Sequence, residues 1–290
     1  MLSPLIFLVV LDEVTRAALD NRNRGVQWTL METLEDLDFA DDIVLMSHRL
    51  KDIQDKTNDL VKESKKVGLK VNIAKTKELR INNNSAEPIK INDEIVETVT
   101  NFTYLGSNVS KDGGCQKDVE LRINKARCTF GRLRNVWRAN NMELRLKLKI
   151  FNACVKSVLL YGCETWFVTN TIEAKLQTFV NRCLRNILGI WWPRLISNEE
   201  LWKRTDQKSI NLEIKKRKYG WIGHTLRKDT KEVCHQALEW NPQGSRRQGR
   251  PKATWRRTVL QECDKKSFGE MRSLAKNRVR WRRYTDSLCS

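Results

Sequence analysis

The chain has 290 residues, enough for two or three domains, and a formal net charge of +19. Residues 1–100 contain 14 Lys and Arg against 18 Asp and Glu, whereas residues 101–290 contain 40 against 17. So large a basic excess predicts a polyanionic partner, with nucleic acid ahead of a membrane surface, and argues against a purely structural role.

Neither export nor membrane insertion is expected. The apolar residues 1–10 lack a basic leading region and are followed by Asp12 and Glu13, which is not typical of a signal peptide. No other segment approaches the ~20 apolar residues that span a bilayer. The eight cysteines include no Cys-x-x-Cys pair, and Cys234-His235 with His224 lacks the usual zinc-ligand spacing. We expect an intracellular protein, nuclear or cytoplasmic and not secreted, with reduced thiols.

The first predicted elements lead to a pair of aspartates. Ser3-Pro4 indicates the start of a helix. The residues expected on its buried face are Leu5, Leu8, Val9, Val14 and Leu19. Residues 21–25 form a predicted turn and residues 26–30 a predicted strand. In residues 34–47, two short apolar runs flank Phe39-Ala40-Asp41-Asp42, which predicts a tight hairpin with adjacent carboxylates at its tip.

Those two carboxylates leave two interpretations open. Adjacent carboxylates repel each other, so a chain tolerates them where water, a turn or a cation compensates. Asp41 and Asp42 therefore form either a solvated surface turn or part of a site for Mg²⁺, which prefers hard oxygen ligands.

Residues 49–106 predict a mixture of helix and strand. Apolar residues recur near the helical period over residues 49–67, and the charged remainder of that helix is expected to be solvated. Residues 71–81 predict a strand, residues 89–96 a hairpin around Asn92-Asp93, and residues 102–105 the last strand. We expect the Asp41–Asp42 hairpin to lie on an antiparallel sheet backed by the helices 4–19 and 49–67.

Beyond Gly113-Gly114 the pattern is helical. Val119 to Trp137 form an apolar seam, and arginines including Arg127 and Arg134 occupy other positions of the same helix. Residues 142–161 and 172–188 predict two more helices, which completes a three-helix bundle. Seven of the ten tryptophans lie from Trp191 onward. Most such rings belong to cores, but aromatic residues interleaved with arginine also stack on unpaired bases.

A basic segment interrupts this last region. It contains Arg246, Arg247, Arg250 and Lys252, and no acidic residue lies between Trp240 and Gln261. Two interpretations of this segment are open: it is a solvated loop, or it contacts phosphates or directs nuclear localisation. Residues 249–251 resemble the centre of an AT-hook, but Gln248 stands where an arginine would precede it, so minor-groove insertion is not expected.

Several motifs together resemble a known family. Residues 39–42 resemble the Tyr/Phe-x-Asp-Asp box of reverse transcriptases. Val67 to Asn72 with Lys75-Thr76-Lys77, and then Phe102 to Ser107, follow in the order found in non-LTR (LINE-type, RTE-like) retrotransposon polymerases. The resemblance continues through residues 159–166 and 221–228 and thus covers essentially the whole chain.

This resemblance implies an α+β fold in three parts. Residues 1–106 would be the C-terminal part of a polymerase palm, an antiparallel sheet with helices. Residues 107–190 would be a helical thumb-like region, and residues 191–290 a basic, Trp/Arg-rich helical region.

The resemblance also implies site residues. Asp41 matches the family's metal-ligating aspartate and Asp42 its supporting neighbour, so Mg²⁺ is the expected cofactor. Lys75 or Lys77 lies where the family places a lysine near the triphosphate. Tyr104 to Gly106 fall where the family holds the primer end.

RNA and DNA are the partners that the resemblance implies. The residues expected to contact them are Tyr104, Gly106, Arg127, Arg134, Arg246, Arg247, Arg250 and Lys252.

The earlier palm aspartate and the fingers have no counterpart in residues 1–38. We therefore expect a truncated RNA-directed DNA polymerase that binds nucleic acid but does not catalyse alone, with an upstream polymerase fragment as a further candidate partner. The alternative is a non-catalytic basic RNA/DNA-binding protein derived from a retroelement.

Overall fold

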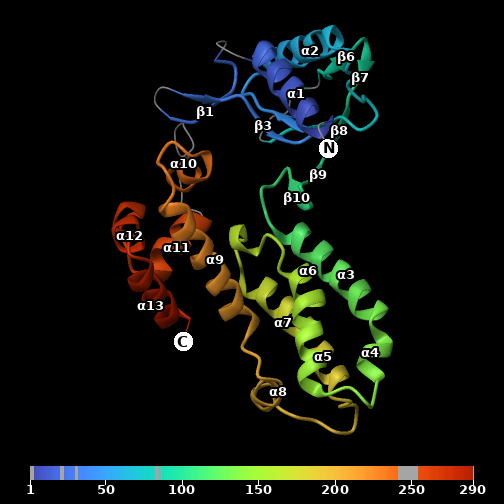
Figure 1. Cartoon of the computed structure of the whole chain (residues 1–290), viewed down its shortest axis with the longest axis vertical. Coiled ribbons are helices and arrows are strands. Elements are labelled where there is room, and N and C mark those ends of the chain that lie inside the picture. Colours follow the sequence, from blue (N-terminus) through green and yellow to red (C-terminus); the bar gives the residue numbers. More distant parts are fainter. Residues whose placement is uncertain are drawn as a thin grey trace. The chain divides into compact units, whose positions relative to one another are not determined.

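The computed structural model describes residues 3–19, 23–29, 32–81, 85, 87–240 and 254–289 (Figure 1). These residues divide into two compact units. The first comprises the described residues up to Phe102 together with Trp240, and the second comprises Thr103–Glu239 and residues 254–289. Each unit encloses its own apolar cores.

The first unit combines two long helices with short strands. Its elements are α1 (Ser3–Leu19), β1 (Val26–Gln27), β2 (Thr33–Leu34), β3 (Asp36–Phe39), β4 (Asp42–Leu45), α2 (Leu50–Lys66), β5 (Lys77–Leu79), β6 (Lys90–Ile91), β7 (Glu94–Ile95), β8 (Glu97–Val99) and the start of β9 (Asn101–Tyr104). Helix α1 packs along α2 (Figure 1). The core between them consists of Val14, Ala18, Leu19 and Leu60, against which β4 packs.

The buried face of α1 is shorter than predicted. Only residues from Val14 onward are buried, whereas Leu5, Leu8 and Val9 are exposed. The expectation for these three residues was wrong because the core contacts of α1 begin at Val14. Periodicity identifies an apolar helix face but does not show how far along the helix a partner extends.

The strands form pairs rather than one sheet. Every sheet in the part of the chain that the structure describes has two strands. The expected antiparallel sheet backed by α1 and α2 is therefore limited to the two strands of the hairpin itself. Strands of two to four residues expose too little apolar surface to build a broad sheet. Strands β5 and β8 pair in parallel, with Lys77 opposite Glu97.

Two local expectations had different outcomes. The hairpin at residues 89–96 is confirmed as β6 and β7, and its turn residues Asn92 and Asp93 have φ +48° and +67°. The strand expected over residues 71–81 is confined to Lys77–Leu79, because Lys75 N and Thr76 N donate to the Asn72 carbonyl oxygen at 3.2 and 3.0 Å and form a turn. A further strand, β10, follows the one predicted to be last.

The second unit is almost entirely helical. Its elements after β9 are β10 (Ser107–Ser110), α3 (Gln116–Arg132), α4 (Arg134–Arg138), α5 (Leu144–Ile150), the π-helical η1 (Phe151–Lys156), α6 (Ser157–Leu159), the 3₁₀ turn η2 (Cys163–Thr165), α7 (Asn170–Ile187), α8 (Asn198–Thr205), α9 (Ile210–Leu226), α10 (Val233–Glu239), α11 (Trp255–Glu262), α12 (Phe268–Ala275) and α13 (Arg278–Leu288). The predicted helical structure of residues 119–137, 142–161 and 172–188 is confirmed, but the first helix breaks at Leu133 into α3 and α4, and the second contains the π-helical η1. The whole chain is α+β, as expected.

Helix α9 joins the two apolar cores of this unit. Ile210 and Ile214 belong to the core built by α3, η1, α6 and α7, and Tyr219 and Ile222 belong to the core built with α11, α12 and α13. Helix α9 runs between these groups (Figure 1). A helix that contacts cores on more than one side carries apolar residues around much of its circumference.

The π-helical turn η1 interrupts the helix between α5 and α6. Phe151 and Val155 are fully buried there, and Lys156 is buried beside them. The Lys156 Nζ pairs with the Glu213 carboxylate of α9 and donates to Gln207 Oε1 at 2.7 Å. Burial lowers the pKa of Lys156, and the charge of Glu213 opposes that shift. The wider turn therefore places an ion pair within an otherwise apolar contact.

Candidate functional site

The candidate site is the hairpin of β3 and β4. Its register pairs Phe39 with Asp42 and leaves a two-residue turn between them. Ala40, the first residue of that turn, has φ +54°, the left-handed conformation of tight hairpin turns. Asp41 follows it, and both Asp41 and Asp42 are exposed. The predicted hairpin with carboxylates at its tip is confirmed.

The two faces of the hairpin differ. Ile43 and Leu45 pack against the core of α1 and α2. Residues directly opposite each other in an antiparallel pair share a face, and Asp38 lies opposite Ile43 and Asp36 opposite Leu45. Asp36 and Asp38 therefore lie on the face toward the helices. Alternation places Phe39 on the other face, where it is 61% exposed.

The inward aspartates hold protons more tightly than free aspartate does. Burial, followed by the charge of Asp38, raises the pKa of Asp36 to about 6. Burial also raises the pKa of Asp38, although hydrogen bonds with Asp36 and Thr15 oppose the shift. The hairpin thus carries two kinds of carboxylate. Asp36 and Asp38 lie on the face toward the helices, where Asp36 is half-buried and Asp38 is exposed at its edge, and Asp41 and Asp42 lie exposed at the tip.

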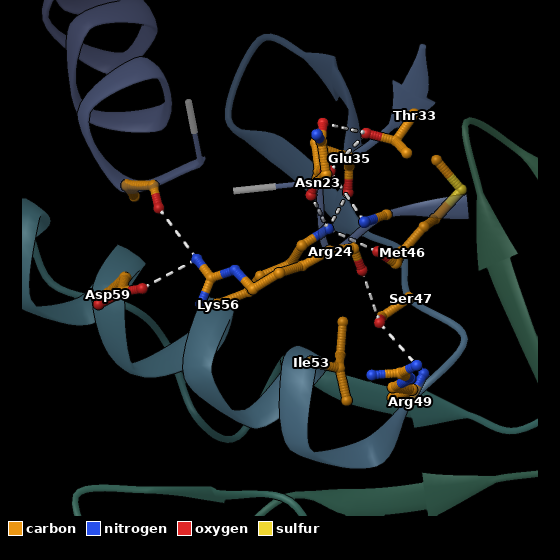
Figure 2. A network of polar contacts seen from close by, with 12 residues as sticks. Asn23, Arg24, Thr33, Glu35, Met46, Ser47, Arg49, Ile53, Lys56 and Asp59 are labelled. Atoms are coloured by element: carbon orange, nitrogen blue, oxygen red, sulfur yellow. Dashed lines mark hydrogen bonds and ion pairs between the residues drawn. The ribbon is translucent and has the colours of Figure 1, made fainter. Parts of the chain in front are cut away.

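Lys56 of α2 holds the base of the hairpin (Figure 2). Its side chain is 0% exposed, and its Nζ donates to the carbonyl oxygens of Glu35 at 3.0 Å and Met46 at 2.6 Å. These residues stand immediately before β3 and after β4. Nζ also pairs with the Glu35 carboxylate. One ammonium group therefore contacts both open ends of the hairpin and fixes them to α2.

The Glu35 carboxylate accepts several hydrogen bonds in this network. Its Oε1 accepts hydrogen bonds from Gly25 N and Thr33 Oγ1, each at 2.8 Å. Burial raises the pKa of Glu35, but the hydrogen bonds from Lys56, Thr33 and Gly25 outweigh it and hold that pKa below its usual value. Burial lowers the pKa of Lys56, and Glu35 opposes that shift. Glu35 and Lys56 thus each offset the unfavourable effect of burial on the charge of the other.

A second set of contacts connects the helices to the chain around the hairpin (Figure 2). Arg24 Nη2 donates to Asp59 Oδ2 of α2 at 2.9 Å and to the Ala18 carbonyl oxygen of α1 at 3.4 Å. The Arg24 carbonyl oxygen accepts from Ser47 Oγ at 2.7 Å, and Ser47 Oγ accepts from Arg49 N at 3.2 Å. The segments before and after the hairpin are therefore tied to each other.

The expectation that the charged face of residues 49–67 is solvated was wrong for Lys56. The residue lies three positions after Ile53 and four before Leu60, so helical geometry places it on the packed face. That spacing was the available signal. It was missed because a lysine on an apolar face is normally assumed to extend its ammonium group into water.

Neither lysine proposed for the triphosphate pairs with the aspartates. Lys77 lies on β5, and its Nζ pairs with the Glu97 carboxylate of β8. Lys75 lies exposed in the turn that precedes β5. Among the described residues no ion pair joins Lys75 or Lys77 to Asp41 or Asp42. The roles of the two lysines therefore stay predictions.

Tyr104 and Gly106 lie at a second hairpin, between β9 and β10. Tyr104 is half-buried, and the turn residues Leu105 and Gly106 have φ +46° and +81°. Arg122 of α3 donates to the Gly106 carbonyl oxygen and stacks 4.3 Å from the centroid of the Tyr161 ring. Tyr161 Oη donates in turn to the Leu105 carbonyl oxygen at 3.1 Å. This turn is thus fixed to the helices that follow it.

The buried Asp118 of α3 supports the same hairpin. Its Oδ1 accepts from Asn108 N of β10 at 2.9 Å, and its Oδ2 accepts from Trp166 Nε1 at 3.0 Å. Sequence analysis did not single out Asp118, Arg122 or Tyr161. The signal was weak: an acid and a base four residues apart on a helix usually form a solvated pair.

The basic residues expected to contact nucleic acid are distributed along the chain. Arg127 on α3 and Arg134 on α4 are exposed, and Arg127 Nη1 donates to Asn124 Oδ1 at 3.1 Å. Arg246, Arg247, Arg250 and Lys252 lie outside the described residues.

Asp41 and Asp42 are the residues that would hold a metal ion. Their carboxylates are hard oxygen ligands that suit Mg²⁺, and they are accessible at the hairpin tip. Within the described ranges, no group of three or more His, Cys, Asp or Glu residues is arranged to hold an ion. The residues present therefore fit part of a magnesium coordination shell. The eight cysteines are free thiols.

None of the described helices combines the length and the apolar character needed to cross a bilayer.

Comparisons with known proteins give three findings. Residues 1–109 match the family model of reverse transcriptase (RNA-dependent DNA polymerase), and this span contains the hairpin. Residues 129–161 match a domain of unknown function, DUF6451. A transposon-derived protein of Caenorhabditis elegans is 25% identical over 264 residues, which cover 86% of this chain and 94% of that protein. These findings support a relation to retroelement reverse transcriptases.

Proposed function

We propose that this chain is a nucleic-acid-binding protein derived from the reverse transcriptase of a non-LTR, RTE-like retroelement. The hairpin tip carries this proposal: Phe39 to Asp42 place two adjacent carboxylates at an exposed two-residue turn, within the span similar to reverse transcriptases. A solvated turn does not need the buried Lys56 ties that fix both ends of this hairpin. The support beneath the tip is what a site that must hold its carboxylates in position requires.

In this proposal the three parts have separate roles. Residues 1–106 form part of a polymerase palm, residues 107–190 a thumb-like region and residues 191–290 a basic region that holds nucleic acid. Tyr104 and Gly106 contact the primer end, and the Arg122 contact to Gly106 keeps that turn in place. Arg127 and Arg134 contact phosphates, together with the basic segment of residues 246–252.

Asp41 and Asp42 supply only part of what polymerisation requires. Divalent metal ions, when bound, stabilise the attacking and leaving oxygens of the phosphoryl transfer. Asp41 holds the metal, Asp42 supports it, and Lys75 or Lys77 contacts the triphosphate. Asp36 and Asp38, the other carboxylates of the hairpin, lie on the opposite face. We therefore propose that these 290 residues bind nucleic acid but do not polymerise alone.

The binding proposal is tested by its salt dependence. If roughly six phosphates are contacted, log K should fall with log salt at a slope of about −4 to −5, for RNA and DNA of unrelated sequence alike. Replacing Arg246, Arg247, Arg250 and Lys252 by glutamine should reduce that slope by about a unit or more. Fluorescence anisotropy of labelled oligonucleotides measures both. An affinity unchanged between about 50 and 200 mM salt would contradict the proposal.

The catalytic proposal is tested by primer extension on an RNA template with Mg²⁺ and four nucleotides. The 290-residue chain should give no product, and Asp41→Ala should change nothing. Removing one group that stabilises a transition state commonly costs about 3–4 kcal/mol, and within the described residues no third carboxylate joins Asp41 and Asp42. Supplying an upstream polymerase fragment should produce extension that Asp41→Ala abolishes. Extension by the chain alone, lost on Asp41→Ala, would mean that another carboxylate such as Asp12 or Asp38 completes the site.

A further inference from the structure

The loop between α7 and α8, residues 188–197, presents two adjacent indoles to solvent. Trp191 is 62% exposed and Trp192 83% exposed. Leu195 of the same loop is 79% exposed. A single exposed apolar side chain such as Leu195 is ordinary, but two adjacent exposed indoles form a local feature that suits a ligand.

The buried tryptophans of the same unit are used differently. Trp137 Nε1 donates to the Phe130 carbonyl oxygen at 2.8 Å, and Trp281 Nε1 donates to the Tyr219 carbonyl oxygen at 3.0 Å. Both rings are almost fully buried. In the described part of the chain, no hydrogen bond or ring contact engages the indole of Trp191 or Trp192. Their indoles are therefore available to a ligand on their faces and at their N–H groups.

The loop has a defined conformation. At its start, Gly189 N donates to the Asn186 carbonyl oxygen at 3.1 Å and Ile190 N to the Arg185 carbonyl oxygen at 2.9 Å. In the middle, Arg194 N donates to the Trp191 carbonyl oxygen at 2.9 Å and closes a turn around Trp192.

Its end is anchored by side chains. Asn198 Oδ1 accepts from Arg185 Nη2 at 2.8 Å and from Asn181 Nδ2 at 3.0 Å. Arg185 Nη2 also donates to the Ile196 carbonyl oxygen at 3.4 Å. Because both ends of the loop are tied to α7, the two indoles lose little conformational freedom when they bind a ligand.

The charge around the loop favours a polyanion. Arg194 of the loop and Arg182 on the last turns of α7 are exposed. Of the two acids that follow, Glu200 pairs with Arg204, at 2.6 Å between its Oε1 and the Arg204 Nε. Residues 101–290 as a whole carry 40 basic and 17 acidic residues. Aromatic rings beside free guanidinium groups on such a surface match the chemistry of unpaired bases linked by phosphates.

We infer that Trp191 and Trp192 form a stacking site for the bases of single-stranded nucleic acid, with Arg194 contacting an adjacent phosphate. The inference rests on the nucleic-acid binding proposed above and adds a specific site with a preference for unpaired strands. Bases stacked within a duplex do not offer their faces, so duplex binding depends on phosphate contacts alone.

Other ligands fit this loop less well. A membrane-surface segment normally lays a broad apolar helix face into the interface, whereas this is a short turn with three apolar side chains. A stable protein interface buries about 800 Å² on each partner, more than such a loop supplies. Single strands need only a few rings and a phosphate contact, which the loop provides.

The test compares the whole chain with the double variant Trp191→Ala/Trp192→Ala. Anisotropy is measured with a mixed-sequence single-stranded DNA of about 20 nucleotides and with its duplex. Loss of two stacked bases should weaken single-strand binding about tenfold to a hundredfold, and duplex binding less than about threefold. Trp191→Phe/Trp192→Phe keeps aromatic faces and should retain most of the affinity. Leu195→Ser, in the same loop, is the matched control and should change little.

The outcomes separate the two proposals. If the unaltered chain binds neither DNA, the general nucleic-acid proposal fails and this inference fails with it. If it binds both, and the double alanine variant binds the single strand equally well, only the stacking site is overturned. A double variant that keeps single-strand affinity but loses binding to phosphatidylserine-containing vesicles would identify the loop as a membrane contact and overturn the inference. Circular dichroism confirms that each variant is folded, which is expected because all three side chains are exposed.

Discussion

The two units are stabilised in different ways. In the second unit, two apolar cores share α9, and most buried residues are aliphatic or aromatic. In the first unit the apolar clusters are small, and its central hairpin is positioned by one buried ammonium group, Lys56, that contacts both strand ends. A directional polar tie fixes a short hairpin in one register, which small apolar contacts do less well because they are not directional.

The candidate aspartates and the excess of positive charge lie in different parts of the chain. The aspartates of the candidate site lie in residues 1–100, where acids outnumber bases by 18 to 14. The excess of basic residues lies beyond them. The proposed carboxylate site for a cation and the proposed surface for a polyanion therefore fall in different parts of the chain, so each can be tested by substitutions that do not touch the other.

Removing the Lys56 tie should have the largest effect. Lys56→Ala removes one donor from the Glu35 carboxylate and from the carbonyl oxygens of Glu35 and Met46, breaks the buried ion pair, and should destabilise the first unit by about 3–5 kcal/mol. Hydrogen exchange should show faster opening of residues 35–46 and little change in α7. Lys51→Ala, at an exposed position of the same helix, is the control and should stay within about 0.5 kcal/mol. Unchanged exchange in the hairpin would mean that apolar packing alone positions it.

Asp118→Ala tests the second unit in the same way, because it removes a buried polar contact from a unit that is stabilised mainly by apolar packing. Asn108 N and Trp166 Nε1 would lose their acceptor, with an expected cost of about 2–3 kcal/mol. Thermal unfolding followed by tryptophan fluorescence measures the loss. Asp112→Ala, which is exposed, should be close to neutral. A neutral Asp118→Ala would show that the apolar cores alone hold β10 in place.

A smaller effect should appear in the pH dependence of the first unit. The pKa of Asp36 is raised to about 6, so its stabilising contribution is fully present at low pH and is lost as pH rises from about 4 through 6. Asp36→Asn imitates the neutral form and should stabilise the unit by about 1 kcal/mol at pH 7.5. At pH 4.5 the gain should be smaller. Denaturant unfolding at the two pH values measures it, with Asp41→Asn as the exposed control. An equal gain at both values would exclude titration of Asp36 as the cause.

The smallest expected effects concern single surface arginines. Arg127→Gln and Arg134→Gln should each weaken nucleic-acid binding about two- to fivefold and reduce the salt slope by less than about a unit. Arg16→Gln, in the acidic part of the chain and paired with Asp12, should leave both quantities unchanged. Equal losses from all three variants would mean that binding responds to net charge and not to a defined basic surface.

Local features of the fold could be predicted from the sequence, and tertiary ones could not. The turns at residues 39–42 and 89–96 follow from short-range rules, because residue type and alternation over a few positions determine a hairpin. The burial of Lys56 depends on where the strand ends lie, and the exposure of Leu5 depends on where along α1 its core contacts begin. No local sequence pattern indicates the burial of Lys56 or the exposure of Leu5.

The same division applies to the candidate site: residues within one motif could be predicted, and contacts between distant residues could not. Asp41 and Asp42 could be located because they are neighbours in one motif. The contact of Arg122 with Tyr161 and the Gly106 carbonyl oxygen joins residues as far as 55 positions apart, and no period in the sequence connects them. The pairing of Lys77 with Glu97 likewise depends on a parallel strand contact that alternation does not reveal.

The π-helical turn η1 has a consequence for changes in chain length. Each residue of an α-helix turns the chain by about 100° and advances it by about 1.5 Å. A π-helical turn holds about one residue more than an α-helical turn, so deleting one residue between Phe151 and Lys156 would let this segment close as regular α-helix and would keep Leu159 and Leu160 in the core in which both are now fully buried. Deletions are usually best tolerated in loops, but η1 should tolerate the loss of one residue better than the regular helices of the second unit, where such a loss rotates everything that follows.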